Sequence, residues 1–165
     1  MARLSGEDLL EGLAGAAILI VNDYEFGILT QKTGLSREEL EERIPVVVVT
    51  HGADGSDDLG RRRQDDGCAT KSRPPRLERE AIDPTGVGDA YRAGLVRGLR
   101  IGAPGRRAGR MGSVSAVFGL EALGPQPPAY SIEEFRARYE RNFGDEPVLE
   151  KLRLGGPNSR LNSQL

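Results

Sequence analysis

The most informative stretch of this sequence is "DPTGVGDAYRAG", Asp83–Gly94. Two glycines, Gly86 and Gly88, stand directly before an acidic residue, and a run of helix-forming residues begins at the same point. Glycines let backbone N–H groups converge where a side chain would obstruct an approaching anion. The first turn of a helix directs its partial positive charge to the same place. The pattern therefore favours a site at which the negative charge of a phosphoryl group is stabilised.

Asp89 follows this glycine turn and falls on the first turn of the expected helix. A carboxylate at that position could accept a proton from an attacking hydroxyl group. An acidic residue also favours a helix N-terminus for reasons of charge alone. A bare G-x-G-D does not separate the chemical role from the structural one.

Two further patterns stand at the ends of expected strands. "NDYE", Asn22–Glu25, follows the apolar run "AAILIV", and "THGADGS" follows "VVVV". Ligands of open α/β sheets gather beyond the carboxyl ends of strands. Asn22 and Glu25 could hold the waters of Mg²⁺ or reach phosphate oxygens, or they could simply cap a helix. The G-x-x-G turn suits close approach to a nucleotide or an ordinary turn, in which His51 is expected to be exposed.

Alternating strand and helix patterns predict an α/β fold with a mostly parallel sheet. Residues 46–50, "VVVVT", form a continuous apolar run, as a strand covered on both faces requires. Another strand is expected near residues 16–22. We expect helices over about 24–32, 87–99 and 106–123, the last rich in small residues, and helices that begin after the capping residues Ser5, Ser36 and Ser131.

The composition excludes several classes of protein. A chain of 165 residues fits one domain, and its net charge of −2 gives no general attraction to nucleic acid or to an anionic membrane. No stretch approaches the about 20 apolar residues of a membrane span, and the N-terminus lacks the apolar stretch of a secretory signal. A single cysteine, Cys68, fits a reducing cytoplasm. We therefore expect a cytoplasmic protein that binds neither nucleic acid nor membranes.

Two segments are expected to lie outside the packed fold. Residues 57–80 show almost no apolar periodicity and are rich in Arg, Asp, Gly and Pro, which is typical of a solvated polar insert. Residues 145–165 are polar and contain Gly, Pro and Asn, and we expect them to form a disordered tail.

Taken together, the motifs resemble the ribokinase-like (PfkB) carbohydrate and nucleoside kinases, and within them the bacterial adenosine kinase-like members. The resemblance is carried by "NDYE", "KTGLSREEL", "VVVVTHGADGS", "DPTGVGDAYRAG" and the closing "YSIEEFRARYERNFG". It covers about residues 4–56 and 81–144. The family resemblance implies that residues 1–144 are the C-terminal, nucleotide-binding portion of a three-layer α/β/α kinase domain, in which the first strands and most acceptor-binding residues have no counterpart here.

The resemblance also implies a reaction, namely transfer of the γ-phosphoryl group of ATP to a primary hydroxyl. Asp89 matches the family's general base, and Gly86, Val87 and Gly88 match its anion hole. Adenosine is the acceptor that the resemblance favours first, with a simple sugar such as ribose or fructose second. This role agrees with the reading of the glycine turn, because phosphoryl transfer depends mostly on positioning and electrostatics.

Other residues receive ligand-binding roles from the resemblance alone. Asn22 and Glu25 match a Mg²⁺ site, held through water, and Thr50, Gly52 and Gly55 match the border of the ATP site. The helix near Ser113–Val117, with Ser113, would flank adenine. Asp83 and the carbonyl of Thr85 match a monovalent cation site, such as one for K⁺.

A different class of function competes with the kinase. A chain that lacks the acceptor-binding half could be a catalytically inactive remnant that binds nucleotide, or an interaction fragment. The sheet edge that such a half-domain leaves open could pair with a second copy or with a complementary N-terminal half.

Overall fold

The structure is a computed structural model that describes residues 3–59, 70–125 and 129–155. The chain divides into two compact units, Met1–Pro74 and Pro75–Leu165. Cys68 and residues 60–69 of the expected polar insert lie outside the described residues.

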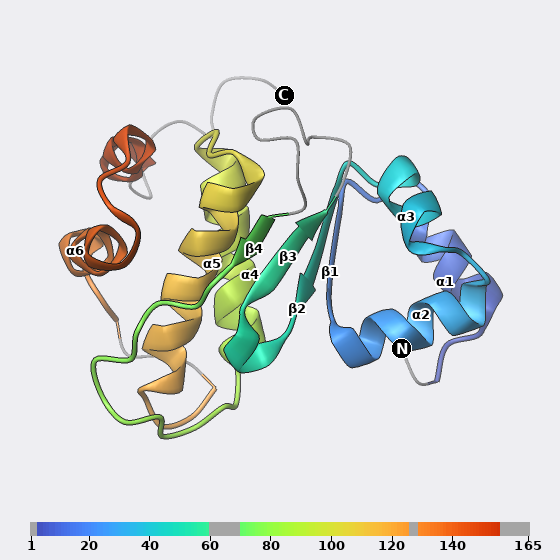
Figure 1. Ribbon diagram of the computed structural model, residues 1–165, viewed down its shortest axis with the longest axis horizontal. Coiled ribbons are helices and arrows are strands. Elements are labelled where there is room, and N and C mark those ends of the chain that lie inside the picture. The colour runs from blue at the N-terminus through green and yellow to red at the C-terminus, as the bar shows by residue number, and fades with distance from the viewer. Residues whose placement is uncertain (1–2, 60–69, 126–128, 156–165) are drawn as a thin grey trace, which may run out of the picture. The chain divides into compact units, whose positions relative to one another are not determined.

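The first unit is built on a small sheet in the order β1-β2-β3-β4 (Figure 1). Its strands are β1 (Ile18–Asn22), β2 (Val46–Thr50), β3 (Ser56–Leu59) and β4 (Thr70–Ser72). β1 and β2 are parallel, and their register pairs Asn22 with Thr50. The two polar residues therefore stand next to each other at the carboxyl ends of their strands.

The remaining strand pairs differ from the sequence expectation. β3 is antiparallel to β2, and β4 is antiparallel to β3. The turn between β2 and β3 contains only the short 3-10 helix η1 (Gly52–Asp54), and so short a connection allows only an antiparallel hairpin. Among the described strands, parallel pairing is therefore found for β1 and β2 alone. The expected insert begins with a strand, β3, rather than a loop.

Three helices complete the first unit: α1 (Gly6–Leu13), α2 (Asp23–Thr33) and α3 (Arg37–Arg43). Each begins with a capping box, in which the N-cap side chain and the acidic side chain three residues later exchange hydrogen bonds with each other's backbone N–H groups. The helices and one face of the sheet share an apolar core of Leu9, Val21, Leu29, Leu35, Leu40, Ile44, Val47 and Val49.

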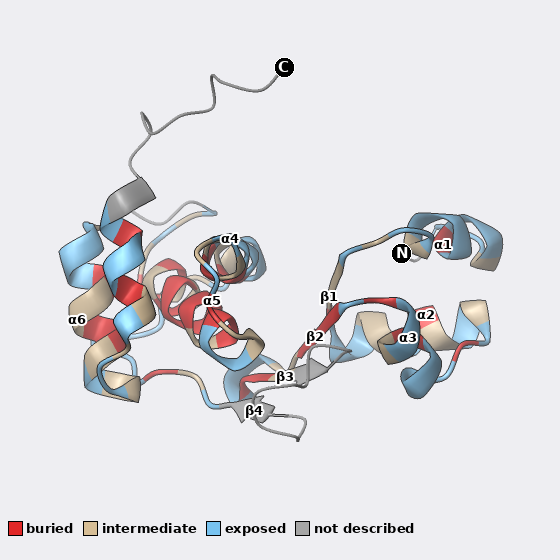
Figure 2. Ribbon diagram, turned by 90° about the horizontal axis from the view of Figure 1, so that it is seen from above, coloured by how far each residue is buried: buried red, intermediate tan, exposed pale blue. Residues whose placement is uncertain are grey.

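The second unit consists of helices: α4 (Val87–Arg100), α5 (Gly105–Leu120), α6 (Ile132–Phe143) and the 3-10 helix η3 (Pro147–Gly155). Figure 2 shows that α5 is buried along much of its length. Glycines let α4 and α5 approach closely, because a Cβ at Gly98 would lie 2.8 Å from Cα of Ala108. A Cβ at Gly112 would lie 2.9 Å from the carbonyl oxygen of Tyr91. The small residues noted in the sequence therefore serve helix packing.

The C-terminal region differs from the expected disordered tail. Residues 147–155 form η3, in which Leu149 and Leu152 are buried. This part of the tail packs because these two leucines are apolar. Their i,i+3 spacing is difficult to recognise in the sequence because the surrounding residues are mostly polar. Residues 156–165 lie outside the described residues. Among the described helices, none combines the length and the apolar character that crossing a membrane requires.

Candidate functional site

The glycine turn adopts the conformation that its sequence predicts. Gly86 is the N-cap of α4 and has φ 79° and ψ −3°, in the left-handed region that favours glycine. A Cβ at this position would also overlap the carbonyl oxygen of Pro125. Within the described residues, the N–H groups of Gly86 and Gly88 donate to no protein acceptor, whereas that of Val87 donates to the carbonyl of Pro84 at 3.3 Å. The turn therefore offers free N–H donors at the start of a helix.

Asp89 lies on the first turn of α4, directly after these donors. Its side chain is 80% exposed, and its Oδ1 accepts a hydrogen bond of 2.7 Å from Nη1 of Arg92. The carboxylate is therefore accessible to a solute, with Oδ2 available as a proton acceptor. Arg92 was not among the residues that the sequence analysis singled out, although its i+3 spacing from Asp89 on a helix is the signal that could have found it.

Asp83 holds the loop in front of α4. Its Oδ1 accepts a hydrogen bond of 2.8 Å from the N–H of Thr85, and its Oδ2 accepts one of 2.9 Å from the N–H of Gly124. Hydrogen bonds from the side chain and N–H of Thr85, together with that from Gly124, lower the pKa of Asp83. Both carboxylate oxygens of Asp83 thus bind backbone N–H groups. These bonds do not show oxygen atoms arranged around a cation, so the monovalent cation role stays a prediction.

Asn22 and Glu25 form the capping box of α2. Oδ1 of Asn22 accepts from the N–H of Glu25 at 2.7 Å, and Oε2 of Glu25 accepts from the N–H of Asn22 at 3.0 Å. The capping role that the sequence left open is thus confirmed. Among the described residues Oε1 of Glu25 has no hydrogen-bond partner, and Asn22 is exposed. Hard oxygen donors of this kind fit a hydrated Mg²⁺.

The G-x-x-G turn follows β2 in the same unit. Gly52 and Gly55 have φ 56° and 95°, and the N–H of His51 donates to the carbonyl of Gly55 at 2.8 Å, which closes the turn. His51 is not the exposed residue that the sequence suggested, because its side chain is only 29% exposed and its Nε2 lies 3.2 Å from Oδ2 of Asp57. Nη2 of Arg37 lies 3.5 Å from the same oxygen. Asp57 was missed because it was assigned to the polar insert.

Ser113 is buried in α5 and its hydroxyl donates to the carbonyl of Gly109, in the preceding turn, at 3.1 Å. Its side chain is therefore satisfied by its own helix. A place beside adenine stays a prediction for this residue.

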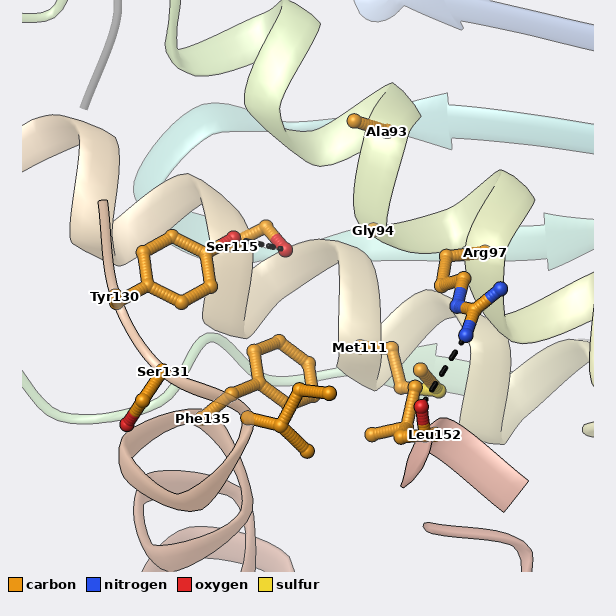
Figure 3. Close-up of a pocket in the computed structure, with 10 residues that line it drawn as sticks. Ala93, Gly94, Arg97, Met111, Ser115, Tyr130, Ser131, Phe135 and Leu152 are labelled. Carbon is orange, nitrogen blue, oxygen red and sulfur yellow. Dashed lines mark hydrogen bonds between the residues drawn. The ribbon is translucent and has the colours of Figure 1, made fainter. Parts of the chain in front are cut away.

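A cavity of about 220 Å³ lies between α4, α5, α6 and η3 (Figure 3). Tyr130 donates from its hydroxyl to Oγ of Ser115 at 3.2 Å, and Nη2 of Arg97 donates to the carbonyl of Leu152 at 3.3 Å. Ligand pockets are usually larger than about 300 Å³. Ser115 belongs to the helix segment expected to flank adenine, but none of the individually predicted site residues lines this cavity.

The predicted residues thus gather in two groups. In the first unit the strand register places Asn22 beside Thr50, ahead of the glycine turn that follows β2. In the second unit the hydrogen-bonded carboxylate of Asp83, the turn at Gly86 and the carboxylate of Asp89 follow one another at the start of α4. A glycine turn with free N–H groups and an accessible carboxylate are two of the features that phosphoryl transfer uses.

Comparison with known proteins shows a relation to a family of kinases. A family model described as "pfkB family carbohydrate kinase" matches residues 2–131. A nucleoside kinase from Methanothermobacter thermautotrophicus is 36% identical over 133 residues, a match that covers 80% of this chain and 40% of that protein.

Solved structures show the same fold. The nucleoside kinase of Burkholderia thailandensis in complex with inosine has a TM-score of 0.80 at 34% identity, over 87% of this chain and 46% of that one. The nucleoside kinase of Methanocaldococcus jannaschii, an archaeal member of the ribokinase family, has a TM-score of 0.77 at 27% identity, over 86% and 45% of the two chains. The chain spans less than half the length of each of these relatives. These likenesses confirm the α/β, ribokinase-like fold, and the chain belongs to the pfkB family of carbohydrate kinases.

Proposed function

We propose that this chain is the nucleotide-binding portion of a kinase that transfers the γ-phosphoryl group of ATP to a primary hydroxyl of a nucleoside. The observation that carries the proposal is the start of α4, where Gly86 has a positive φ and the exposed carboxylate of Asp89 follows at once. The nucleoside kinases among the relatives support a nucleoside acceptor, with adenosine the first choice and inosine, the ligand of the Burkholderia thailandensis enzyme, another candidate. A simple sugar such as ribose or fructose is the second choice.

In the proposed reaction the acceptor oxygen attacks the γ-phosphorus, and the bond from that phosphorus to the β,γ-bridging oxygen breaks to release ADP. The hydroxyl proton passes to Asp89, which acts as general base. The N–H groups of Gly86, Val87 and Gly88 form the anion hole that stabilises charge on the phosphoryl oxygens. Val87 must give up its weak bond to Pro84 to contribute fully.

The remaining roles extend the same proposal. Asn22 and Glu25 would hold Mg²⁺ through water, and the ion would neutralise charge on the phosphates when bound. Thr50, Gly52 and Gly55 would border ATP, and the helix at Ser113 would flank adenine. The nucleoside kinase of Burkholderia thailandensis has also been solved in complex with ADP-inosine, which supports use of an adenine nucleotide by a relative.

The test compares turnover and binding in the wild type and in Asp89→Asn, a substitution that keeps the shape of the side chain and removes the base. ADP release is measured with Mg·ATP and adenosine, inosine or ribose, and ATP binding is measured by calorimetry. We expect Asp89→Asn to reduce turnover by about 10²–10⁴-fold. Glu133→Gln, at an exposed acid on the first turn of α6, is the matched control and should leave turnover unchanged.

Two results would contradict the proposal. Turnover that survives Asp89→Asn would remove Asp89 from the reaction. ATP binding without turnover on any acceptor would favour the alternative of a nucleotide-binding remnant.

A further inference from the structure

Arg92 is bonded to the proposed base and lies beside the glycine turn. Its Nη1 donates to Oδ1 of Asp89 at 2.7 Å. Apart from the chain neighbours of Gly88 and the local helix backbone, the same nitrogen is the nearest heavy atom to a Cβ built at Gly88, at 4.0 Å. Helical side chains point toward the N-terminus of their helix, and this direction brings the guanidinium group of Arg92 back over the first turn of α4.

The guanidinium group of Arg92 has N–H donors that the bond to Asp89 does not use. It carries five N–H donors in a planar fork, and the bond to Asp89 uses one nitrogen. The side chain of Arg92 is 45% exposed, so the remaining donors are accessible to a solute. A planar fork of this kind matches the oxygens of a phosphate group in geometry as well as in charge.

Arg92 would reduce an electrostatic repulsion that the proposed function creates at this turn. The proposed function brings the terminal phosphate of ATP, which is negatively charged, close to the carboxylate of Asp89. Like charges at short distance repel each other, and a guanidinium group in contact with both relieves that repulsion. The ordinary explanation of an Asp–Arg pair at i,i+3 is a weak surface ion pair, and it predicts no effect on ligands.

We infer that Arg92 is a phosphate-binding residue, which donates to oxygens of the terminal phosphate of the nucleotide while it holds Asp89. The inference rests on the proposed function for the place of the phosphate at the Gly86–Gly88 turn. It assigns Arg92 to binding of the polyphosphate and not to binding of the nucleoside part.

The experiment is calorimetric titration of the full chain with Mg·ATP and, separately, with AMP, which lacks the two outer phosphates. The variants are Arg92→Gln, Arg92→Lys and, as a matched control, Arg100→Gln at an exposed arginine in the last turn of the same helix. We expect Arg92→Gln to weaken ATP binding about tenfold to a hundredfold, as loss of a charged hydrogen bond does. AMP binding should not change, Arg92→Lys should be intermediate, and Arg100→Gln should bind like the wild type.

Each outcome decides the inference. Equal ATP affinity in Arg92→Gln and in the wild type overturns it, and so does an equal loss of ATP and AMP affinity, or a wild type that binds no ATP. Thermal melting of the variants shows whether a loss is due to unfolding. The proposed function fails separately: a chain that binds ATP through Arg92 but transfers no phosphoryl group to any acceptor supports this inference and contradicts that proposal.

Discussion

At Gly86 the backbone conformation and the packing oppose the same substitution. Gly86→Ala would place a side chain in the left-handed region, at a cost of about 1–2 kcal/mol, and would also push a methyl group into the carbonyl of Pro125. We expect it to lower the free energy of unfolding of the second unit by about 2–5 kcal/mol, the strain plus an overpacking cost. Chemical denaturation followed by circular dichroism measures the change.

The variant Gly34→Ala separates the cost of backbone strain from the cost of the contact with Pro125. Gly34 has nearly the same conformation as Gly86, with φ 71° and ψ 3°, and a Cβ there would meet no atom within 4 Å. Gly34→Ala should therefore cost the strain alone. Equal costs for the two substitutions would show that the contact with Pro125 contributes nothing.

Asn22 has a measurable structural role beside its proposed role in binding. Asn22→Ala removes the hydrogen bond to the N–H of Glu25 and should destabilise the chain by about 1 kcal/mol. Asn22→Asp keeps an acceptor at the N-cap and should restore stability. It also adds a negative charge, so we expect calorimetry to show weaker Mg·ATP binding than in the wild type. Wild-type affinity in Asn22→Asp would indicate that Asn22 is only a cap.

Residue patterns predicted the backbone geometry at the start of α4, where local sequence alone is sufficient. The spacing of Gly86, Gly88 and Asp89 predicts a turn at a helix start, and the structure has it. The contact of His51 with Asp57 could not be predicted, because it depends on the hairpin that turns β3 back along β2. Whether Ser113 or Asp83 contacts a ligand also depends on more than local sequence, and both stay predictions.

Between α4 and α5, glycines determine how closely the two helices approach. Gly98→Ala would gain about 1 kcal/mol of helix propensity, but its Cβ would lie 2.8 Å from Cα of Ala108, which is backbone and cannot move aside. We expect the overlap to dominate, with a net loss of about 1–2 kcal/mol, measured by chemical denaturation.

Gly12 in α1 provides the control for Gly98. A Cβ at Gly12 would meet no atom within 4 Å, so Gly12→Ala should stabilise the chain by about 0.5–1 kcal/mol. If Gly98→Ala were also stabilising, the close approach of α4 and α5 would be wrong.

Elements with strong local signals were predicted from the sequence, and the others were not. The capping residues Ser5, Ser36 and Ser131 mark the helix starts, and each makes the expected bond to the N–H three residues later. β3 could not be recognised from its sequence, "SDDL", because its two aspartates are unfavourable in strands. Pairing with β2 overrides that local preference.

Across the second unit, one buried ion pair joins three segments that are distant in sequence. Arg138 of α6 is 1% exposed and donates to Glu121 at 2.9 Å and 2.5 Å. The same carboxylate accepts from the N–H groups of Glu78 and Arg79 at 2.6 Å and 3.0 Å. The end of the segment expected to be a polar insert is thereby fixed to the helices, which no local pattern predicts.

This ion pair should make the stability of the second unit depend on pH. Burial alone would raise the pKa of Glu121, but the hydrogen bonds from Arg138 and from the two backbone N–H groups outweigh burial and lower it from the ordinary value of 4.5. The unfolded chain therefore binds a proton more readily than the folded one. The stabilisation is fully present above about pH 4.5 and is lost as the pH falls through the folded pKa.

Variants of the pair test both its strength and its pH dependence. Arg138→Met alone leaves a buried carboxylate without its partner and should cost about 3–5 kcal/mol at pH 7. Adding Glu121→Leu removes that carboxylate and should recover part of the loss, because an apolar pair can replace a buried ion pair. Recovery should be incomplete, because the N–H groups of Glu78 and Arg79 also lose their acceptor. Denaturation at pH 7 and at pH 4 should show a smaller acid destabilisation in the double variant than in the wild type. The remainder should come from other acids with lowered pKa values, such as Asp83 and Glu134. An unchanged pH dependence in the double variant would show that Glu121 is not a source of the acid sensitivity.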